Sequence, residues 1–355
     1  MSIRLALIPG LTVILFATLE VHAQKDPKPP ALADLMYAKN LAYSNDGSLV
    51  LIDYGTGPNP TKGVGLGIWD TKTGEFRKGM EKSNHHWQRV ALSDDNKKVA
   101  AIDVAGRELK IWNAESGKLD EEQTLPEWKG SVYGASFLKF TPDGTTLYAT
   151  WDKQLLEAKV GGKSRLLSVK LGLVNPNEMS FNPQTRQFIF LHNTQGQKKC
   201  EIFIHDLSKD DAEPQKVITL DDQLQSLAIS HDGKTMALSY IRGGGKPRFE
   251  LWDTDGWKLR TTLPQDQRKG FSAYSILTFA PDDKSIAGAP VFEKRGDKDV
   301  DFLDLDGKLL HEFTHKVFPE WMVFSPDGKT LAVKLLDVKD TVIFVDPATG
   351  EAKKP

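Results

Sequence analysis

Apolar and polar residues alternate along most of this chain in short runs that tight turns interrupt. The clearest example is the apolar run Met322–Phe324, which is followed by Ser-Pro-Asp-Gly and then by a second alternating run from Leu331. Alternation with a period of two predicts a β-strand with one buried face, and Pro-Asp-Gly is typical of a tight turn. This stretch therefore predicts two antiparallel strands joined by a short hairpin turn.

The same strand–turn–strand pattern occurs seven times along the chain. Each copy has an apolar run, a turn built on Asp-Gly or a related pair, and a second alternating run. The turns are centred on Asp46, Asp95, Asp143, Gln184, Asp232, Asp282 and Asp327. Successive turns are about 41 to 50 residues apart, which is the period of propeller blades.

Each copy also has a second half, in which another strand ends in an aromatic–acid or similar step before a Gly turn. The clearest examples are Ile68-Trp69-Asp70, Ile111-Trp112-Asn113 and Leu251-Trp252-Asp253. Each copy then contains four short antiparallel strands, and a single sheet of this size cannot bury both faces. Seven sheets arranged radially can, because each packs on the next. The sequence therefore predicts an all-β protein, a seven-bladed β-propeller of four-stranded antiparallel blades over residues 38–355.

The Ser-Pro-Asp-Gly-Lys turn at 325–329, together with the Trp-Asp steps and Thr-Gly turns, resembles the repeats of WD-repeat and YVTN-type β-propellers. The resemblance covers about residues 38–350 and implies the fold without implying an activity. Two features depart from WD repeats: no copy has a Gly-His pair before its first strand, and Trp of the Trp-Asp step occurs in three copies. We therefore expect a divergent propeller whose blades are held by apolar packing between sheets.

The N-terminal residues 1–23 are typical of a cleaved secretory signal peptide, with Arg4 in a short positive segment and a small-x-small site at Val21-His22-Ala23. An uncleaved anchor is disfavoured because the apolar run contains Pro9, Gly10 and Glu20. We expect an extracytoplasmic protein, periplasmic or secreted, with no membrane span after cleavage.

Two further expectations concern how the ring closes. Residues 24–37 are rich in Pro and Lys and predict an extended lead-in. Only five residues follow Gly350, which is short for an outer strand. Either the lead-in supplies the outer strand of the last blade, or that blade ends in a stub.

Composition narrows the functional classes. The net charge of the 355 residues is −2 at pH 7, so bulk attraction to nucleic acid or to an anionic membrane is not indicated. The single cysteine, Cys200, can form neither an internal disulfide nor a metal site by itself. The sequence indicates no cofactor, and we expect a monomer.

Ligand binding is expected on the face of the propeller that carries the long, varied loops, because binding residues concentrate on such loops. One set of candidates there is basic and comes from neighbouring blades, which would suit an anionic glycan; alternatively, these side chains only keep exposed loops soluble. This set comprises Arg242, Lys246, Arg248, Lys294 and Arg295. A second set precedes the innermost strands, facing the channel mouth, where a small polar molecule could bind: Arg89, Glu178 and Trp321. Arg89 and Glu178 could instead pair with each other or with solvent.

The segment His311-Glu312-Phe313-Thr314-His315 matches the H-E-x-x-H motif of zinc proteases. That chemistry needs a helix, which brings both imidazoles to one zinc ion. The repeat register instead places the motif in the outer strand of blade six, where residues i and i+4 lie about 13 Å apart. Zn–N bonds of about 2 Å cannot span that distance, so we predict no metal site here.

The leading hypothesis is a secreted or periplasmic scaffold that binds a protein or an anionic glycan through its long-loop face. The alternative is a propeller enzyme, such as a lactonase or a sugar-acting hydrolase or lyase, with its site at the mouth of the central channel. Fold analogy alone supports that alternative. Convergent His, Asp, Glu or Arg side chains around a pocket would favour the enzyme, and a flat rim of aromatic and basic loops would favour binding.

Overall fold

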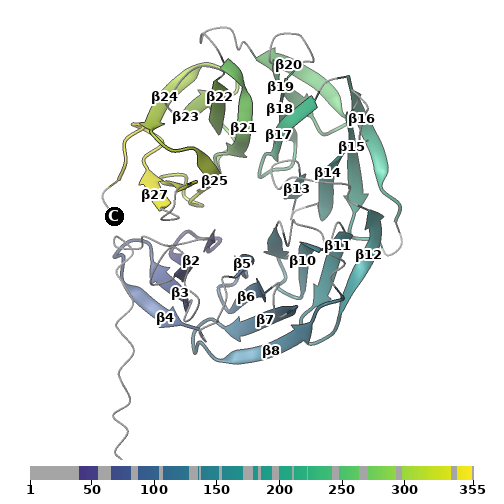
Figure 1. The fold of residues 1–355 in the computed structure, drawn as a ribbon, viewed down its shortest axis with the longest axis vertical. Coiled ribbons are helices and arrows are strands. Elements are labelled where there is room, and N and C mark those ends of the chain that lie inside the picture. Colours follow the sequence, from purple (N-terminus) through teal and green to yellow (C-terminus); the bar gives the residue numbers. More distant parts are fainter. Residues whose placement is uncertain are drawn as a thin grey trace, which may run out of the picture.

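Seven antiparallel sheets surround a central axis in the computed structural model, which confirms the predicted β-propeller (Figure 1). The structure describes residues 40–54, 65–80, 87–103, 107–127, 135, 137–151, 154–170, 179–182, 185–193, 200–209, 212–221, 223–241, 248–263, 271–292, 298–336 and 342–353. Within these ranges, no helix is long and apolar enough to cross a bilayer.

In each blade the strands follow one another in sequence from the innermost to the outermost. Blades one and two consist of β1 (Leu41–Tyr43), β2 (Leu49–Tyr54), β3 (Gly65–Asp70), β4 (Phe76–Gly79), β5 (Arg89–Leu92), β6 (Lys98–Asp103), β7 (Glu108–Asn113) and β8 (Leu119–Thr124). Blades three and four consist of β9 (Leu138–Phe140), β10 (Thr146–Trp151), β11 (Gln154–Lys159), β12 (Ser164–Lys170), β13 (Met179–Asn182), β14 (Gln187–Asn193), β15 (Cys200–Asp206) and β16 (Gln215–Leu220). Blades five and six consist of β17 (Gln223–Ile229), β18 (Thr235–Ile241), β19 (Arg248–Asp253), β20 (Lys258–Leu263), β21 (Phe271–Phe279), β22 (Ser285–Phe292), β23 (Lys298–Asp304) and β24 (Leu309–His315).

Blade seven has three strands in the described part of the chain: β25 (Pro319–Phe324), β26 (Leu331–Leu335) and β27 (Val342–Val345). Beyond β27, Ala352 bridges Val345, and the Lys353 amide donates to the Phe344 carbonyl at 2.7 Å. The C-terminal residues therefore add a short stub to the outer edge of β27. Residues 1–23 and the lead-in 24–37 lie outside the described residues.

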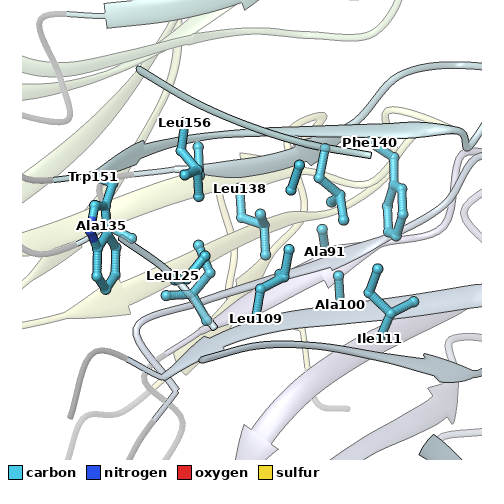
Figure 2. Packing of buried hydrophobic residues seen from close by; sticks show 14 residues of the cluster. Ala91, Ala100, Leu109, Ile111, Leu125, Ala135, Leu138, Phe140, Trp151 and Leu156 are labelled. Atoms are coloured by element: carbon cyan, nitrogen blue, oxygen red, sulfur yellow. The ribbon is translucent and has the colours of Figure 1, made fainter. Parts of the chain in front are cut away.

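Apolar side chains fill the seams between blades, as expected. Between blades two and three, Ala100 and Ile111 face Leu138 and Phe140 from the next sheet (Figure 2). Each sheet in the ring has two buried faces, because its alternating side chains point toward one neighbour or the other. Central strands such as β2 and β26 are accordingly buried along almost their whole length, rather than on one face as the alternation in the sequence predicted.

Hydrogen bonds also cross the seams, so the blades are held together by more than the apolar packing that the sequence predicted. Between blades five and six, the Ser226 hydroxyl donates to the Tyr274 carbonyl at 2.7 Å, and the Tyr274 amide donates to Ser239 Oγ at 2.8 Å. Tyr274 then reaches within its own sheet to the buried Asp301, with its hydroxyl 3.0 Å from Oδ2. Hydroxyl groups thus satisfy backbone groups that the close approach of two sheets removes from water.

The hairpin turns between the first and second strands of the blades lie on the face opposite the long loops, here called the short-loop face, and they share one hydrogen-bond pattern. The Ser44 hydroxyl donates to Asp46 Oδ1 at 2.7 Å, and the same oxygen accepts the Ser48 amide at 3.0 Å. Four further turns repeat the hydroxyl–carboxylate bond with the pairs Ser93–Asp95, Thr141–Asp143, Ser230–Asp232 and Ser325–Asp327. Because these bonds favour the ionised carboxylate, the pKa of Asp46 and that of Asp143 are lowered to about 2.

Side chains from these turns also join neighbouring blades. Asn96 and Asp283 adopt positive φ at the turn position that glycine holds in other copies, and Arg186 does so one position later in its own turn. Asn96 Nδ2 lies 3.4 Å from Asp46 Oδ1, and Arg186 Nη2 lies 3.1 Å from Asp143 Oδ2. Asp283 accepts the backbone amides of His231 and Asp232 at 2.7 and 2.9 Å. These bonds offset the strain of the left-handed backbone, and they indicate a structural role for the short-loop face.

Acid is expected to weaken the fold through the turn aspartates. A carboxyl whose folded pKa lies below its unfolded value stabilises the protein above the unfolded pKa, and that contribution is lost as the pH falls through the folded pKa. For Asp46 and Asp143 this contribution to stability is lost as the pH falls from about 4 to about 2. The urea midpoint measured between pH 5 and pH 2 should fall less steeply in Asp46→Asn and Asp143→Asn than in the wild type. Asp120→Asn, on the exposed outer strand β8, serves as the control; equal slopes in all proteins would contradict the hydrogen-bond assignment.

Candidate functional site

Three of the predicted binding residues lie in the described part of the chain. Arg89 is the first residue of β5, Trp321 lies in β25, and Arg248 is the first residue of β19. The other predicted residues, Glu178, Arg242, Lys246, Lys294 and Arg295, lie outside the described residues. Their role in ligand binding stays a prediction.

Arg248 is held by its own blade. Its guanidinium lies over the Tyr240 ring, 4.5 Å from the centroid, and Nη1 lies 3.5 Å from Glu250 Oε1. Glu250 is buried and also accepts the Trp252 indole N–H at 3.1 Å. A ligand that used Arg248 would compete with these contacts. The structure therefore gives this side chain a packing role, and its role in ligand binding stays a prediction.

Arg89 takes part in a polar chain that crosses the seam between blades one and two. Its Nη1 atom donates to the Gln88 carbonyl at 2.6 Å and lies 3.4 Å from Asn40 Oδ1. The Asn40 backbone amide and Nδ2 donate to the two carboxylate oxygens of Asp53 at 2.7 and 3.0 Å, and Nδ2 also donates to the Trp87 carbonyl. Asn40 therefore connects the guanidinium of one blade to the buried carboxylate of another.

Blade seven adds an ion pair to this polar chain. Lys334 in β26 is aligned with Trp321 in β25, and its ammonium group pairs with the carboxylate of Glu320. The Lys334 side chain is 4% exposed, whereas that of Glu320 is 43% exposed. Burial lowers the pKa of Arg89, and the negative charges of Glu320 and Asp53 oppose that shift, so the Glu320 carboxylate of blade seven acts on the Arg89 guanidinium of blade two.

We call Asn40, Asp53, Arg89, Glu320 and Lys334 the charged cluster. Asn40, Arg89 and Glu320 lie at the start of the innermost strands or just before it, at the end of each strand away from the hairpin turn. This is the long-loop end of the propeller, where blades seven, one and two are neighbours in the ring (Figure 1). The cluster brings two cations and two carboxylates together there.

Sequence reasoning found Arg89 and Trp321 but missed Glu320, Lys334 and Asp53. A signal for two of them was present: Lys334 and Asp53 are charged residues inside otherwise apolar strands, Leu-Ala-Val-Lys-Leu and Leu-Val-Leu-Ile-Asp-Tyr. A charge within a buried strand needs a partner, because an unpaired charge is costly to remove from water. Nothing comparable distinguishes Glu320.

An exposed apolar pair lies beside the charged cluster. Phe318 and Leu336 are 39% and 65% exposed, and the Leu336 amide donates to the Phe318 carbonyl at 2.8 Å. Phe318 precedes β25, and Leu336 follows β26. The remaining exposed large hydrophobic residues of the described chain are Leu119, Leu259 and Leu310, which lie on the outermost strands of their blades.

The H-E-x-x-H segment lies in β24, the outermost strand of blade six, which confirms its predicted place on a strand. Its two histidines are therefore not arranged as on a helix. Across the described residues, no group of three or more His, Cys, Asp or Glu side chains is placed to hold a metal ion.

Comparison with known proteins adds information on the fold. No family model and no curated protein matches the sequence. Among solved structures, Kuenenia stuttgartiensis hydrazine synthase is similar with a TM-score of 0.64 and 15% identity, over 88% of this chain and 96% of that chain. The Myceliophteria thermophila Cps50 (Swd1) β-propeller domain is similar with a TM-score of 0.62 and 12% identity, over 87% of this chain and 97% of that chain.

At these identities the likeness concerns the fold alone. The repeat pattern and the seven sheets agree with it. The chain is a divergent seven-bladed β-propeller repeat protein whose fold is similar to that of WD-repeat propellers.

Proposed function

We propose that this protein is an extracytoplasmic scaffold that binds a partner through its long-loop face. The carrying observation is the apolar pair Phe318–Leu336, exposed at the long-loop end of blade seven beside the charged cluster. A protein partner suits this surface best, and an anionic glycan is the other outcome of the experiment below. The enzyme alternative stays a prediction from fold analogy.

Single exposed hydrophobic residues are ordinary on protein surfaces. This pair differs because a backbone hydrogen bond holds its two members together and because charged side chains lie next to it. An apolar anchor with a polar surround is the usual arrangement of the residues that contribute most to protein–protein affinity. The rigid blades beneath would keep the pair in position without an ordering cost on binding.

The experiment is affinity capture from the extracytoplasmic fraction with the wild-type chain and two matched double variants. Phe318→Ser/Leu336→Ser removes the apolar pair, whereas Leu119→Ser/Leu259→Ser removes two exposed leucines from outer strands. A partner that binds the proposed surface should be lost from the first variant and retained by the second, with circular dichroism showing that both are folded. The endogenous chain in that fraction should begin at Gln24.

Retention of every captured partner by Phe318→Ser/Leu336→Ser would count against the proposal. If the material lost is polysaccharide rather than protein, the partner is a glycan.

A further inference from the structure

Lys139 is an exposed cation in the innermost strand of blade three. It is the middle residue of β9, and Leu138 and Phe140 on either side of it are buried in the seam with blade two (Figure 2). Successive side chains of a strand point to opposite faces, so Lys139 points away from that seam. Because β9 is the strand nearest the central axis, this solvent-exposed side chain faces the channel (Figure 1).

The repeat register shows that a charge at this position is peculiar to blade three. Counted back from the hairpin turn, the equivalent residues of the other six blades are all uncharged, and most of them are small. They are Ala42, Ala91, Ser180, Ala228, Thr278 and Val323. Lys139 therefore brings an ammonium group to a level of the channel where packing of the blades does not require one.

Asp94 brings a carboxylate to the same region from blade two. It directly follows Ser93 in the hairpin turn of that blade, and its side chain is exposed. The turn of blade three lies against this turn, since a Cβ atom at Gly144 would be 3.9 Å from Ser93 Cβ. The innermost strands β5 and β9 are likewise neighbours. Asp94 therefore lies at the boundary with blade three, on the side of the strand that carries Lys139.

The two charges act on each other without a direct bond. Burial lowers the pKa of Lys139, and the negative charge of Asp94 opposes that shift. Burial raises the pKa of Asp94, and the positive charge of Lys139 opposes that shift. Among the described residues, neither side chain has a hydrogen-bond or ion-pair partner. Solvent exposure together with an effect of burial is the expected behaviour of charged groups that face an enclosed channel.

We propose that Lys139 and Asp94 form a binding site in the central channel for a small amino acid, whose carboxylate binds Lys139 and whose ammonium group binds Asp94. A simple anion would be attracted by Lys139 and repelled by Asp94, and a simple cation would meet the reverse. A ligand that carries both charges on a short chain gives each enclosed group an opposite charge. This site is separate from the partner-binding surface at the long-loop end.

The test is an NMR titration of the wild-type chain at pH 7, in which the amides of β5 and β9 report binding. The probes are glycine, 3-aminopropanoate and 4-aminobutanoate, with acetate and methylammonium as ligands of a single charge. At least one of the three amino acids should give saturable shift changes, with a Kd about tenfold lower than that of either single-charge ligand. The chain length that binds best reports the separation of the two protein groups.

Lys139→Met and Asp94→Asn should each weaken binding of that amino acid about tenfold, because each removes one of the two charges. Lys97→Met is the matched control: it removes an ammonium group from the same hairpin turn, where the side chain is 77% exposed, and should bind like the wild type. The double variant Asp94→Lys/Lys139→Asp exchanges the two charges. It should recover binding, since the ligand then binds in the opposite orientation, whereas a purely structural role would not be rescued.

Several results would overturn the proposal. Acetate that binds as tightly as the amino acids, with a loss in Lys139→Met alone, would show a simple anion site. A wild-type chain that binds none of the three amino acids, or single variants that bind them as the wild type does, would show that the two charges have no ligand of this class. The titrations need no protein partner, so their outcome is independent of the capture experiment.

Discussion

Phe324→Asp is expected to unfold the protein or to leave it barely stable. Phe324 is 6% exposed and packs between blades six and seven, where its ring lies edge-on to Phe302 with centroids 6.5 Å apart. Loss of a buried phenylalanine side chain costs about 3–5 kcal/mol, and a buried carboxylate adds several more. Domains of ordinary stability have a free energy of unfolding of about 5–15 kcal/mol. The combined loss from the two effects therefore approaches the whole stability of the protein.

Urea denaturation at pH 7, followed by fluorescence, would measure the effect. Leu336→Asp is the matched control, since it places the same charge in the same blade on a side chain that is 65% exposed. We expect Leu336→Asp to keep a midpoint close to that of the wild type. Similar midpoints for the two variants would mean that Phe324 does not lie in a seam.

Gly117→Ala is expected to destabilise the protein much more than Gly161→Ala, although both glycines lie in the turn before the outermost strand of their blade. Their φ angles are 71° and 73°, so a side chain at either position brings the same backbone strain, about 1–2 kcal/mol. A Cβ atom at Gly117 would lie 2.4 Å from the Gly79 carbonyl oxygen of blade one, whereas a Cβ atom at Gly161 would meet no atom within 4 Å. Since a backbone oxygen cannot rotate away, Gly117→Ala should lose about 1–3 kcal/mol beyond the strain term.

The difference between the two free energies of unfolding isolates the contact between blades one and two, because the strain common to both cancels. Equal losses would indicate that this turn does not press on the neighbouring blade. A larger loss in Gly161→Ala would contradict the structure of blade three at that turn.

The charged cluster shows why part of the candidate site escaped sequence reasoning. The repeat register places Arg89 and Trp321 at equivalent points of their blades, so the sequence identifies both as facing the same end of the propeller. It does not show that the Glu320 carboxylate acts on Arg89, because the two residues belong to blades separated by blade one in the ring. Ring closure brings the first and last blades together, and only then do these charges meet.

Arg248 shows a contact that sequence reasoning could not supply. Basic residues in long loops suggest a ligand, and the sequence does not distinguish an arginine in solvent from one over an aromatic ring. The structure places its guanidinium over Tyr240 and near the buried Glu250. The side chain can make those contacts because Arg248 and Tyr240 are paired across β18 and β19, a register that depends on the folded sheet.

The amino-acid sequence by itself determined the number of blades, the order of strands within them and the strand position of His311 and His315. Those features follow from local periodicity and turn chemistry, which act within a few residues and recur in every copy. The tertiary structure decided which polar side chains cross the seams, how the C-terminal stub adds to β27, and that Lys334 is buried with an exposed partner. These depend on contacts between distant segments, whose energies are set by burial and charge only after the ring has formed.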